Sequence, residues 1–434
     1  MNMKKFLALL IALMLAKESH ALPSRYDLRD YNRVTSVKNQ GISGPCWAFA
    51  ALGSMESNWL TQKLNTDKKI PDLSEMQLAY YSYKNSTIEK NFSSKFKEGM
   101  LRLEGNALRA AAFLSRLSGP ANERDLLYIT TNLDAIKKYA ANRKPEDYRR
   151  PMRLRDVYFL SRLENTTDSI RKNLIMKHGA IVISMWHKMD KFNMTRIYFT
   201  YFNNNNKETN HDVLLIGWDD NFSRDNFNPK PSRNGAWLVK NSFGDLFGNM
   251  GGYFWLSYEQ YIIGGAAFIA ERNTPNMRHY GYDDLGYCSA KNYSWGANIF
   301  KTVNKLESLR EAGFYTTHNN MDYEIYIYTH GSKFPASPVS GNLAASTKGK
   351  IEYAGYHTVK LPESVRLKQG EYFSVVIKFS RSSIAVESKV KWYSENVLVN
   401  QNESYFSSDG KKWTDGAKLS DKSNACIKAF TIVR

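Results

Sequence analysis

The spacing of apolar residues changes near residue 180 of this 434-residue chain, and this change limits the possible folds more than any other feature. Before residue 180 the spacing is helical: Trp47, Ala51, Met55 and Trp59 are four residues apart, as on one face of an α-helix. After it, short apolar runs indicate strands, at residues 180–185, 213–216, 236–239 and 253–256. Helices followed by strands predict an α+β domain with two lobes.

A second domain is predicted after a linker at residues 273–276, which read Asn-Thr-Pro-Asn. Strand-like segments recur beyond it, separated by turn signals at residues 331–332, 369–370 and 409–410. No long helical pattern intervenes. We therefore predict an all-β sandwich over residues 273–434, following the α+β domain of residues 22–272.

The N-terminus has the pattern of a secretory signal peptide. Lys4 and Lys5 precede an apolar run over residues 6–16, and Ser19 and Ala21 supply small residues at the cleavage-determining positions. The sequence predicts removal of residues 1–21 and a soluble protein exported to the periplasm, the cell surface or the medium. No later stretch approaches the ~20 apolar residues of a membrane span.

The formal net charge is +18, which favours contact with anionic surfaces. No zinc-finger, helix-turn-helix or RNA-binding signature accompanies this charge, so nucleic acid is not expected as a partner. Residues 137–155 are rich in Lys and Arg without an apolar period, and we interpret them as a solvated surface loop. The loop that begins at Asp219 lacks the glycine and glutamate of a calcium-binding loop, and we interpret it as a polar loop.

Three motifs that lie far apart in the sequence contain the candidate catalytic residues, at residues 40–47, 210–218 and 237–244. Cys46 lies where the first helix is predicted to begin, and a helix N-terminus stabilises a thiolate. His211 opens a predicted strand, from which its imidazole can take the thiol proton. The side chain of Asn241 can orient that imidazole. The backbone N–H of Cys46 and the side-chain amide of Gln40 can stabilise an oxyanion.

Taken singly, such residues are usually core or turn residues, but here they occur together, in order and with flanking Trp and Gly. In these motifs the chain resembles the papain-like cysteine peptidases, most closely a bacterial branch with a C-terminal lectin-like domain. Residues 23–29 resemble the start of the mature family domain. The resemblance assigns Cys46 as nucleophile, His211 as base, Asn241 as orienting residue and Gln40 as oxyanion donor.

The resemblance also implies a hydrolase that forms a thioester on Cys46 and needs no metal or organic cofactor. It places Gly105 and Asn106 in the loop that binds the substrate main chain, with Asn210 and Phe243 at the same surface. The apolar run at residues 261–268 suggests an apolar specificity pocket. Segments at 290–341 and 354–359 are similar to the lectin-like domain, which makes a carbohydrate or anionic cell-surface partner a further expectation.

Departures from the family pattern keep two alternatives open. Ser43 stands where many relatives have cysteine, Phe243 replaces the usual tryptophan, and Pro45 precedes the nucleophile. A weakly active homologue could serve as a glycan-binding adhesin, and the same thioester could pass its acyl group to an amine in a transpeptidase. Whether Cys288 and Cys426 form a disulfide is left open by the sequence.

Overall fold

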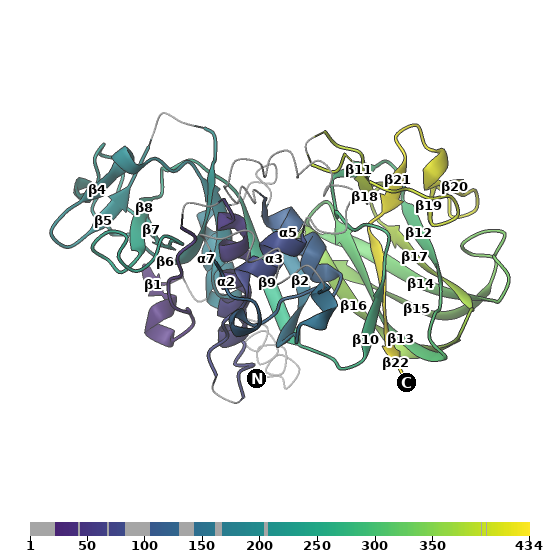
Figure 1. The fold of residues 1–434 in the computed structure, drawn as a ribbon. Coiled ribbons are helices and arrows are strands. Elements are labelled where there is room, and N and C mark those ends of the chain that lie inside the picture. The colour runs from purple at the N-terminus through teal and green to yellow at the C-terminus, as the bar shows by residue number, and fades with distance from the viewer. Residues whose placement is uncertain are drawn as a thin grey trace, which may run out of the picture.

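The structure of the chain is a computed structural model that describes residues 22–41, 44–66, 69–82, 105–129, 143–160, 167–203, 207–391, 393–395 and 397–434 (Figure 1). The predicted signal peptide, Ser43 and residues 137–142 lie outside these ranges. None of the helices in the described ranges is long and apolar enough to cross a membrane.

Residues 22–272, called here the N-terminal half, combine helices with strands in the predicted order. The helices are α2 (Cys46–Thr61), α3 (Glu75–Tyr81), α5 (Ala107–Ser115) and α7 (Asp168–His178). The strands are β1 (Arg25–Asp27), β2 (Met152–Phe159), β3 (Ile181–Met185), β4 (Phe192–Met194), β5 (Phe199–Tyr201), β6 (His211–Asp219), β7 (Ala236–Lys240), β8 (Tyr253–Ser257) and β9 (Ile262–Arg272). All four apolar runs that indicated strands are strands: β3, β6, β7 and β8.

Helix α2 is central to this half because it is buried on nearly every side. Residues 47–59 are all buried, and Figure 1 shows the helix beside β6 and β9. The four-residue apolar spacing found in the sequence gives the face that packs into the core, while small residues such as Ala48 and Gly53 let neighbouring elements approach closely. A helix enclosed in this way provides a rigid support for the residue at its first position.

In residues 273–434, the C-terminal half, the described elements are strands and one short 3₁₀ helix (Gly416–Lys418), which agrees with the predicted all-β architecture. The strands are β10 (Met277–Tyr280), β11 (Ser289–Lys291), β12 (Trp295–Lys301), β13 (Leu306–Thr316), β14 (Met321–Gly331), β15 (Asn342–Ile351), β16 (Gly355–Lys368), β17 (Tyr372–Phe379), β18 (Ile384–Ser388), β19 (Ser404–Ser407), β20 (Thr414–Asp415), β21 (Ser423–Ala425) and β22 (Ile427–Val433). One sheet has the order β15-β14-β17-β12-β19-β20, and its inner face shares an apolar core with β13, β16 and β22.

A single sheet runs through both halves, with the strand order β10-β22-β13-β16-β2-β9-β3-β6-β7-β8-β5-β4. The connection is the antiparallel pairing of β16 with β2, where Tyr356 lies opposite Val157. The two halves also share one hydrophobic core cluster, to which Tyr315 and Tyr356 of the C-terminal half belong. The C-terminal half is therefore packed against the N-terminal half rather than tethered beside it.

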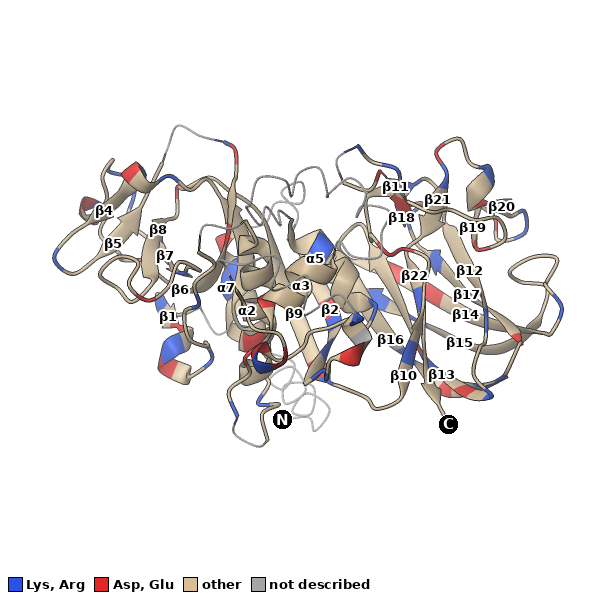
Figure 2. Ribbon diagram, viewed as in Figure 1, with Lys and Arg blue, Asp and Glu red and all other residues tan. Residues whose placement is uncertain are grey.

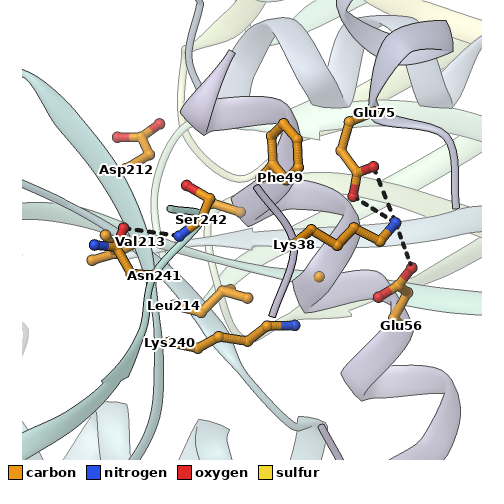
Figure 3. Close-up of a pocket in the computed structure, with 12 residues that line it drawn as sticks. Lys38, Phe49, Glu56, Glu75, Asp212, Val213, Leu214, Lys240, Asn241 and Ser242 are labelled. Atoms are coloured by element: carbon orange, nitrogen blue, oxygen red, sulfur yellow. Dashed lines mark hydrogen bonds and ion pairs between the residues drawn. The ribbon is translucent and has the colours of Figure 1, made fainter. Parts of the chain in front are cut away.

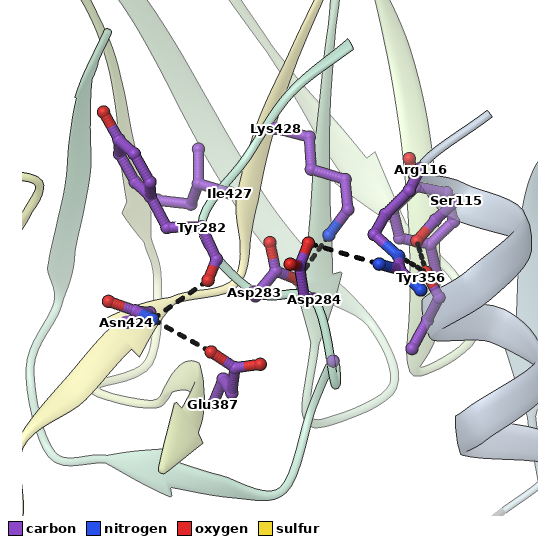
Figure 4. Close-up of polar contacts among 12 residues, drawn as sticks. Ser115, Arg116, Tyr282, Asp283, Asp284, Tyr356, Glu387, Asn424, Ile427 and Lys428 are labelled. Carbon is purple, nitrogen blue, oxygen red and sulfur yellow. Dashed lines mark hydrogen bonds and ion pairs between the residues drawn. The ribbon is translucent and has the colours of Figure 1, made fainter. Parts of the chain in front are cut away.

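Two charge pairs lie beside this junction. Lys428 and Asp283 form an ion pair in which both side chains are fully buried. Beside it, Arg116 at the end of α5 pairs with Asp284 at 3.3 Å, which joins the N-terminal half to the C-terminal half (Figure 4). Lys428 and Asp283 both belong to the C-terminal half, so of these two pairs only Arg116–Asp284, in which the Asp284 side chain is 62% exposed, connects the two halves.

The prediction of a solvated loop over residues 137–155 is wrong at its C-terminal end. Residues 152–155 begin strand β2, and Arg153 is only 2% exposed. Its guanidinium pairs with Glu311 of β13 at 2.8 Å and with Glu271 of β9 at 2.5 Å. Two carboxylates thus neutralise a charge that the sequence pattern alone indicated to be solvated.

The three cysteines of the chain are free thiols in the structure. The Sγ atom of Cys288 lies 3.3 Å from the carbonyl oxygen of Gly286 and 3.3 Å from the Oγ atom of Ser394, while Cys426 is buried. The structure therefore contains no disulfide between Cys288 and Cys426.

Candidate active site

Cys46 is the first residue of helix α2, as the sequence predicted. Pro45 occupies the N-cap position, and its carbonyl oxygen accepts the N–H of Ala48 at 2.8 Å. No acidic side chain lies in the first turn of α2. The partial positive charge of the helix N-terminus is therefore not offset by an acid within the turn itself.

His211 is held by a hydrogen bond to Asn241. The imidazole Nε2 lies 2.8 Å from Asn241 Oδ1, which also accepts the backbone N–H of Ser242 at 2.8 Å. A carbonyl oxygen can only accept, so Nε2 carries the hydrogen and Nδ1 is left as the basic nitrogen. Because His211 begins β6 and Asn241 directly follows the neighbouring β7, the sheet itself sets their separation.

Aromatic rings enclose this hydrogen bond. Phe243 stacks on the imidazole of His211, with ring centroids 4.8 Å apart, and the ring of Phe247 packs against Phe243. His187 meets the edges of both His211 and Phe243, at 5.2 Å each. His211 is consequently only 6% exposed.

Gln40 is fixed by its contacts with the segment that follows Asn241. Its Oε1 accepts the hydroxyl of Ser242 at 2.5 Å, and its backbone N–H donates to the carbonyl oxygen of Ser242 at 2.8 Å. Tyr128 donates to the carbonyl oxygen of Gln40 at 2.9 Å. With Oε1 engaged in this way, the orientation of the Gln40 amide is defined.

A pocket of about 700 Å³ brings seven of the eight predicted site residues together. Asn241 is the exception, since it lies behind His211 and does not line the pocket. The described lining residues are Gln40, Gly41, Gly44, Cys46, Gly105, Asn106, Ser184, His187, Thr209, Asn210, His211, Asp212 and Phe243. The apolar run at residues 261–268 contributes none of them, so the expected apolar wall is not found here.

The predicted substrate-binding residues have defined structural positions. A Cβ atom at Gly105 would lie 2.4 Å from the indole of Trp47, so close packing requires glycine. Asn106 caps helix α5 by accepting the N–H of Arg109 at 3.0 Å. Asn210 makes paired hydrogen bonds with the backbone of His187, at 2.6 and 3.0 Å, and thereby joins two walls of the pocket.

Six of the described lining residues were not predicted as site residues: Gly41, Gly44, Ser184, His187, Thr209 and Asp212. Ser184 belongs to strand β3, and His187 follows that strand. Strand β3 pairs with β6, so that Ser184 lies opposite Asp212 and Met185 lies opposite His211. The sequence signals were the position of Asp212 directly after His211 and of His187 just beyond a predicted strand.

Burial dominates the electrostatics of the site. It raises the pKa of the Cys46 thiol to about 12, with a further contribution from the negative charge of Asp212. Burial lowers the pKa of His211 to about 4, against the stabilising hydrogen bond from Asn241. Each group by itself is thus neutral near pH 7. A charged pair depends on their mutual attraction and on the dipole of α2.

A metal centre is not evident in the described ranges, where no three His, Cys, Asp or Glu side chains gather as ligands.

Solved structures and sequence relatives resemble the chain over different lengths. The clostridial cysteine protease Cwp84 after propeptide cleavage superposes with a TM-score of 0.79 and 26% identity, covering 95% of this chain and 100% of that one. A structure of the cysteine protease and lectin-like domains of Cwp84, described as a surface layer associated protein of Clostridium difficile, gives 0.78 and 26%, covering 95% of this chain and 89% of that one.

Curated sequence relatives match about half of the chain. A probable cysteine protease of Arabidopsis thaliana is 27% identical over 238 residues, which is 54% of this chain and 56% of the relative. A viral cathepsin of Mamestra configurata nucleopolyhedrovirus is 30% identical over 232 residues, 53% of this chain and 56% of the relative. The chain thus spans about half the length of these curated relatives.

Family models assign both halves. Residues 279–431 match the lectin-like domain, and residues 22–271 match the papain family cysteine protease. The match to the second model extends over more than half of the chain, which also shares its α+β architecture followed by a β-rich domain with Cwp84. The chain therefore belongs to the papain family of cysteine proteases and carries a C-terminal lectin-like domain.

Proposed function

We propose that this chain is an exported cysteine endopeptidase that hydrolyses peptide bonds through a thioester on Cys46. The observation that carries the proposal is the 2.8 Å hydrogen bond between His211 and Asn241 at the edge of the pocket that contains Cys46. This bond leaves His211 Nδ1 as the proton acceptor in the cleft.

In the first half of the reaction, His211 takes the proton of the Cys46 thiol as Sγ attacks the carbonyl carbon of the scissile bond. The Gln40 amide and the backbone N–H of Cys46 stabilise the oxyanion. The imidazolium then donates its proton to the departing amine, and the acyl group remains on sulfur. Because burial by itself favours the neutral thiol and the neutral imidazole, the nucleophilic thiolate forms by transfer of the Cys46 proton to His211.

In the second half, His211 removes a proton from water, which attacks the thioester. The carboxylic acid product leaves, and the proton returns to Cys46. Asn241 keeps the imidazole in the required orientation throughout, while Phe243 shields the hydrogen bond between them. Gly105, Asn106 and Asn210 line the same pocket and would contact the peptide main chain.

Labelling with a peptidyl epoxide that alkylates activated thiols tests this function. We expect one adduct per chain, located at Cys46 by mass spectrometry and absent in both Cys46→Ala and His211→Ala. Cys288→Ala is the matched control, since it removes another half-buried thiol outside the pocket, and should label normally. Absence of both labelling and peptide cleavage in folded, reduced protein would overturn the proposal. Aminolysis in preference to hydrolysis with an added amine would replace it by acyl transfer.

Export is part of the proposal and is supported by the N-terminal sequence pattern and by the surface-layer association named for Cwp84. Mass analysis of the exported protein would show whether it begins at Leu22. Figure 2 shows Lys and Arg on many elements of both halves, interspersed with Asp and Glu. We therefore propose that any attraction to an anionic cell surface arises from overall charge rather than from one patch.

A second candidate function is carbohydrate binding by the lectin-like domain. Trp295 of β12 stacks on Tyr326 of β14 with centroids 5.8 Å apart, and Trp413 meets its edge at 6.5 Å. The Lys378 ammonium lies over the Trp295 ring and pairs with Glu324 at 2.7 Å. A half-buried aromatic ring can stack on the apolar face of a sugar, and the charged groups beside the ring can hydrogen-bond the sugar hydroxyls.

Glycan-array binding of the Cys46→Ala protein tests this second function. Trp295→Ala should abolish binding, whereas Phe334→Ala, which removes an exposed aromatic ring next to Tyr372, should retain it. Equal binding by both variants would exclude the Trp295 surface as the sugar site.

A further inference from the structure

The pocket that contains Cys46 and His211 has one carboxylate among its described lining residues, that of Asp212. Asp212 follows His211 on β6 and is 8% exposed. Ser184, opposite it on β3, donates its hydroxyl to Asp212 Oδ1 at 2.5 Å. Both residues line the pocket, so a substrate side chain that enters this part of the cleft meets an acidic wall.

Within the described ranges, no lysine or arginine forms an ion pair with Asp212. Burial is the main influence on its pKa, which is raised to about 6, and only the Ser184 hydroxyl opposes that shift. The nearby Lys38 and Lys240 extend toward Glu56 and Glu75, away from Asp212 (Figure 3). A buried carboxylate with no cation is costly to ionise, and a cation brought by a ligand would offset that cost.

We propose that Asp212 selects peptide substrates that carry an arginine or lysine side chain within two residues of the scissile bond. This inference rests on the proposed peptidase function. A guanidinium or ammonium group in the pocket would pair with Asp212 and gain a charge-assisted hydrogen bond in a largely desolvated site. An apolar side chain in the same position would bury the carboxylate further without compensation.

The same contact would assist the chemistry. The charge of Asp212 opposes ionisation of the Cys46 thiol. A cationic substrate side chain that pairs with Asp212 cancels that charge when the substrate is bound, so the correct substrate makes Cys46 easier to deprotonate. Specificity would therefore be expressed in kcat as well as in KM.

The test compares arginine with citrulline, which has nearly the same shape but no charge. Otherwise neutral peptides carry one or the other at each position from two residues before the scissile bond to two after it. At one position we expect wild-type protein to prefer arginine by about 10- to 100-fold in kcat/KM, the range for hydrogen bonds to charged groups. In Asp212→Asn the ratio should fall to about one. Asp225→Asn, which removes a charge from an exposed loop, should keep the wild-type ratio.

The possible outcomes separate this inference from the proposed function. Cleavage of neutral peptides with no arginine preference at any position would overturn the inference and leave the peptidase standing. An arginine preference that persists in Asp212→Asn would assign the selection to another group. If neither cleavage nor labelling of Cys46 occurs, both proposals fail. The wild-type comparison needs no variant, so an absence of arginine preference overturns the inference even if Asp212→Asn does not fold.

Discussion

Phe243 stacks almost parallel on the imidazole of His211, with ring centroids 4.8 Å apart and an angle of 12° between the planes. The imidazole that Phe243 covers makes the 2.8 Å hydrogen bond to Asn241, which in the proposed mechanism keeps the imidazole oriented. Water that reaches this bond would compete for both partners. Phe243 thus packs over the imidazole at the position where the family resemblance leads one to expect tryptophan.

Phe243→Ala should therefore lower kcat/KM about tenfold, the equivalent of one net hydrogen bond, with most of the loss in kcat. The measurement is steady-state hydrolysis of a fluorogenic peptide. Phe243→Trp restores a ring of at least equal size and should retain near wild-type activity. Equal activity in the alanine and tryptophan variants would contradict a shielding role.

The reactivity of Cys46 should depend on Asp212. Because the carboxylate charge raises the pKa of the thiol, Asp212→Asn should lower that pKa and increase the thiolate fraction at any given pH. Alkylation of substrate-free protein by iodoacetamide should then reach its half-maximal rate at lower pH than in wild type. Site-resolved mass spectrometry separates Cys46 from the other two thiols. An unchanged or higher midpoint would show that the two groups do not interact.

The candidate catalytic residues could be located from the sequence because they occur at element boundaries that leave a clear pattern. Cys46 begins a helix with four-residue apolar spacing, and His211 and Asn241 stand at the ends of apolar runs. By contrast, Ser184 and Asp212 meet only through the register of β3 on β6, which a single sequence does not encode locally. The shape and charge of the pocket therefore had to come from the fold.

The junction between the two halves could not be predicted from the sequence either, because it also depends on the pairing of strands that lie far apart in the chain. Arg153 lies in a segment with eight Lys and Arg residues and resembles a solvated residue until Glu271 and Glu311 are brought beside it by β9 and β13. Long-range partners decide whether a charge is buried or exposed. The linker at 273–276 was predicted, but the continuous sheet across it was not.

Lys38 should contribute more to stability than the other buried lysine near it. It lies within 3.0 Å of carboxylate oxygens of Asp72 and Glu75 and 3.8 Å from Glu56 (Figure 3). Lys38→Met would remove the cation that pairs with the buried Glu56 and Glu75 and leave Lys240, which donates to Thr35, as the nearby cation. We expect a loss of about 3 kcal/mol in the free energy of unfolding at pH 7. Urea denaturation followed by fluorescence measures this loss.

Lys240→Met is the matched comparison for Lys38. Burial lowers the pKa of Lys240 to about 8, below its unfolded value of 10.5, so the folded protein bears a cost while this lysine is charged. That cost is present below pH 8 and is relieved as the pH rises from 8 toward 10.5. Lys240→Met should thus be much less destabilising than Lys38→Met at pH 7 and should remove this rise in stability. Equal losses in the two variants would contradict the assignment.

Arg153 should be the strongest single charged contact between the two halves. Its guanidinium joins β2 and β9 of the N-terminal half to Glu311 of β13, and the Arg153 and Glu311 side chains are 2% and 5% exposed. Arg153→Met leaves Glu311 buried without a partner, and the expected loss in unfolding free energy is about 3 kcal/mol. Arg155, two residues along the same strand, has a 49% exposed side chain and pairs with Asp156 at 3.4 Å. Arg155→Met should change stability by no more than about 0.5 kcal/mol, because exposed ion pairs are largely compensated by water. Urea unfolding of the two variants side by side provides the measurement, and similar small losses in both would mean that packing of Tyr356 and its neighbours, rather than Arg153, holds the junction.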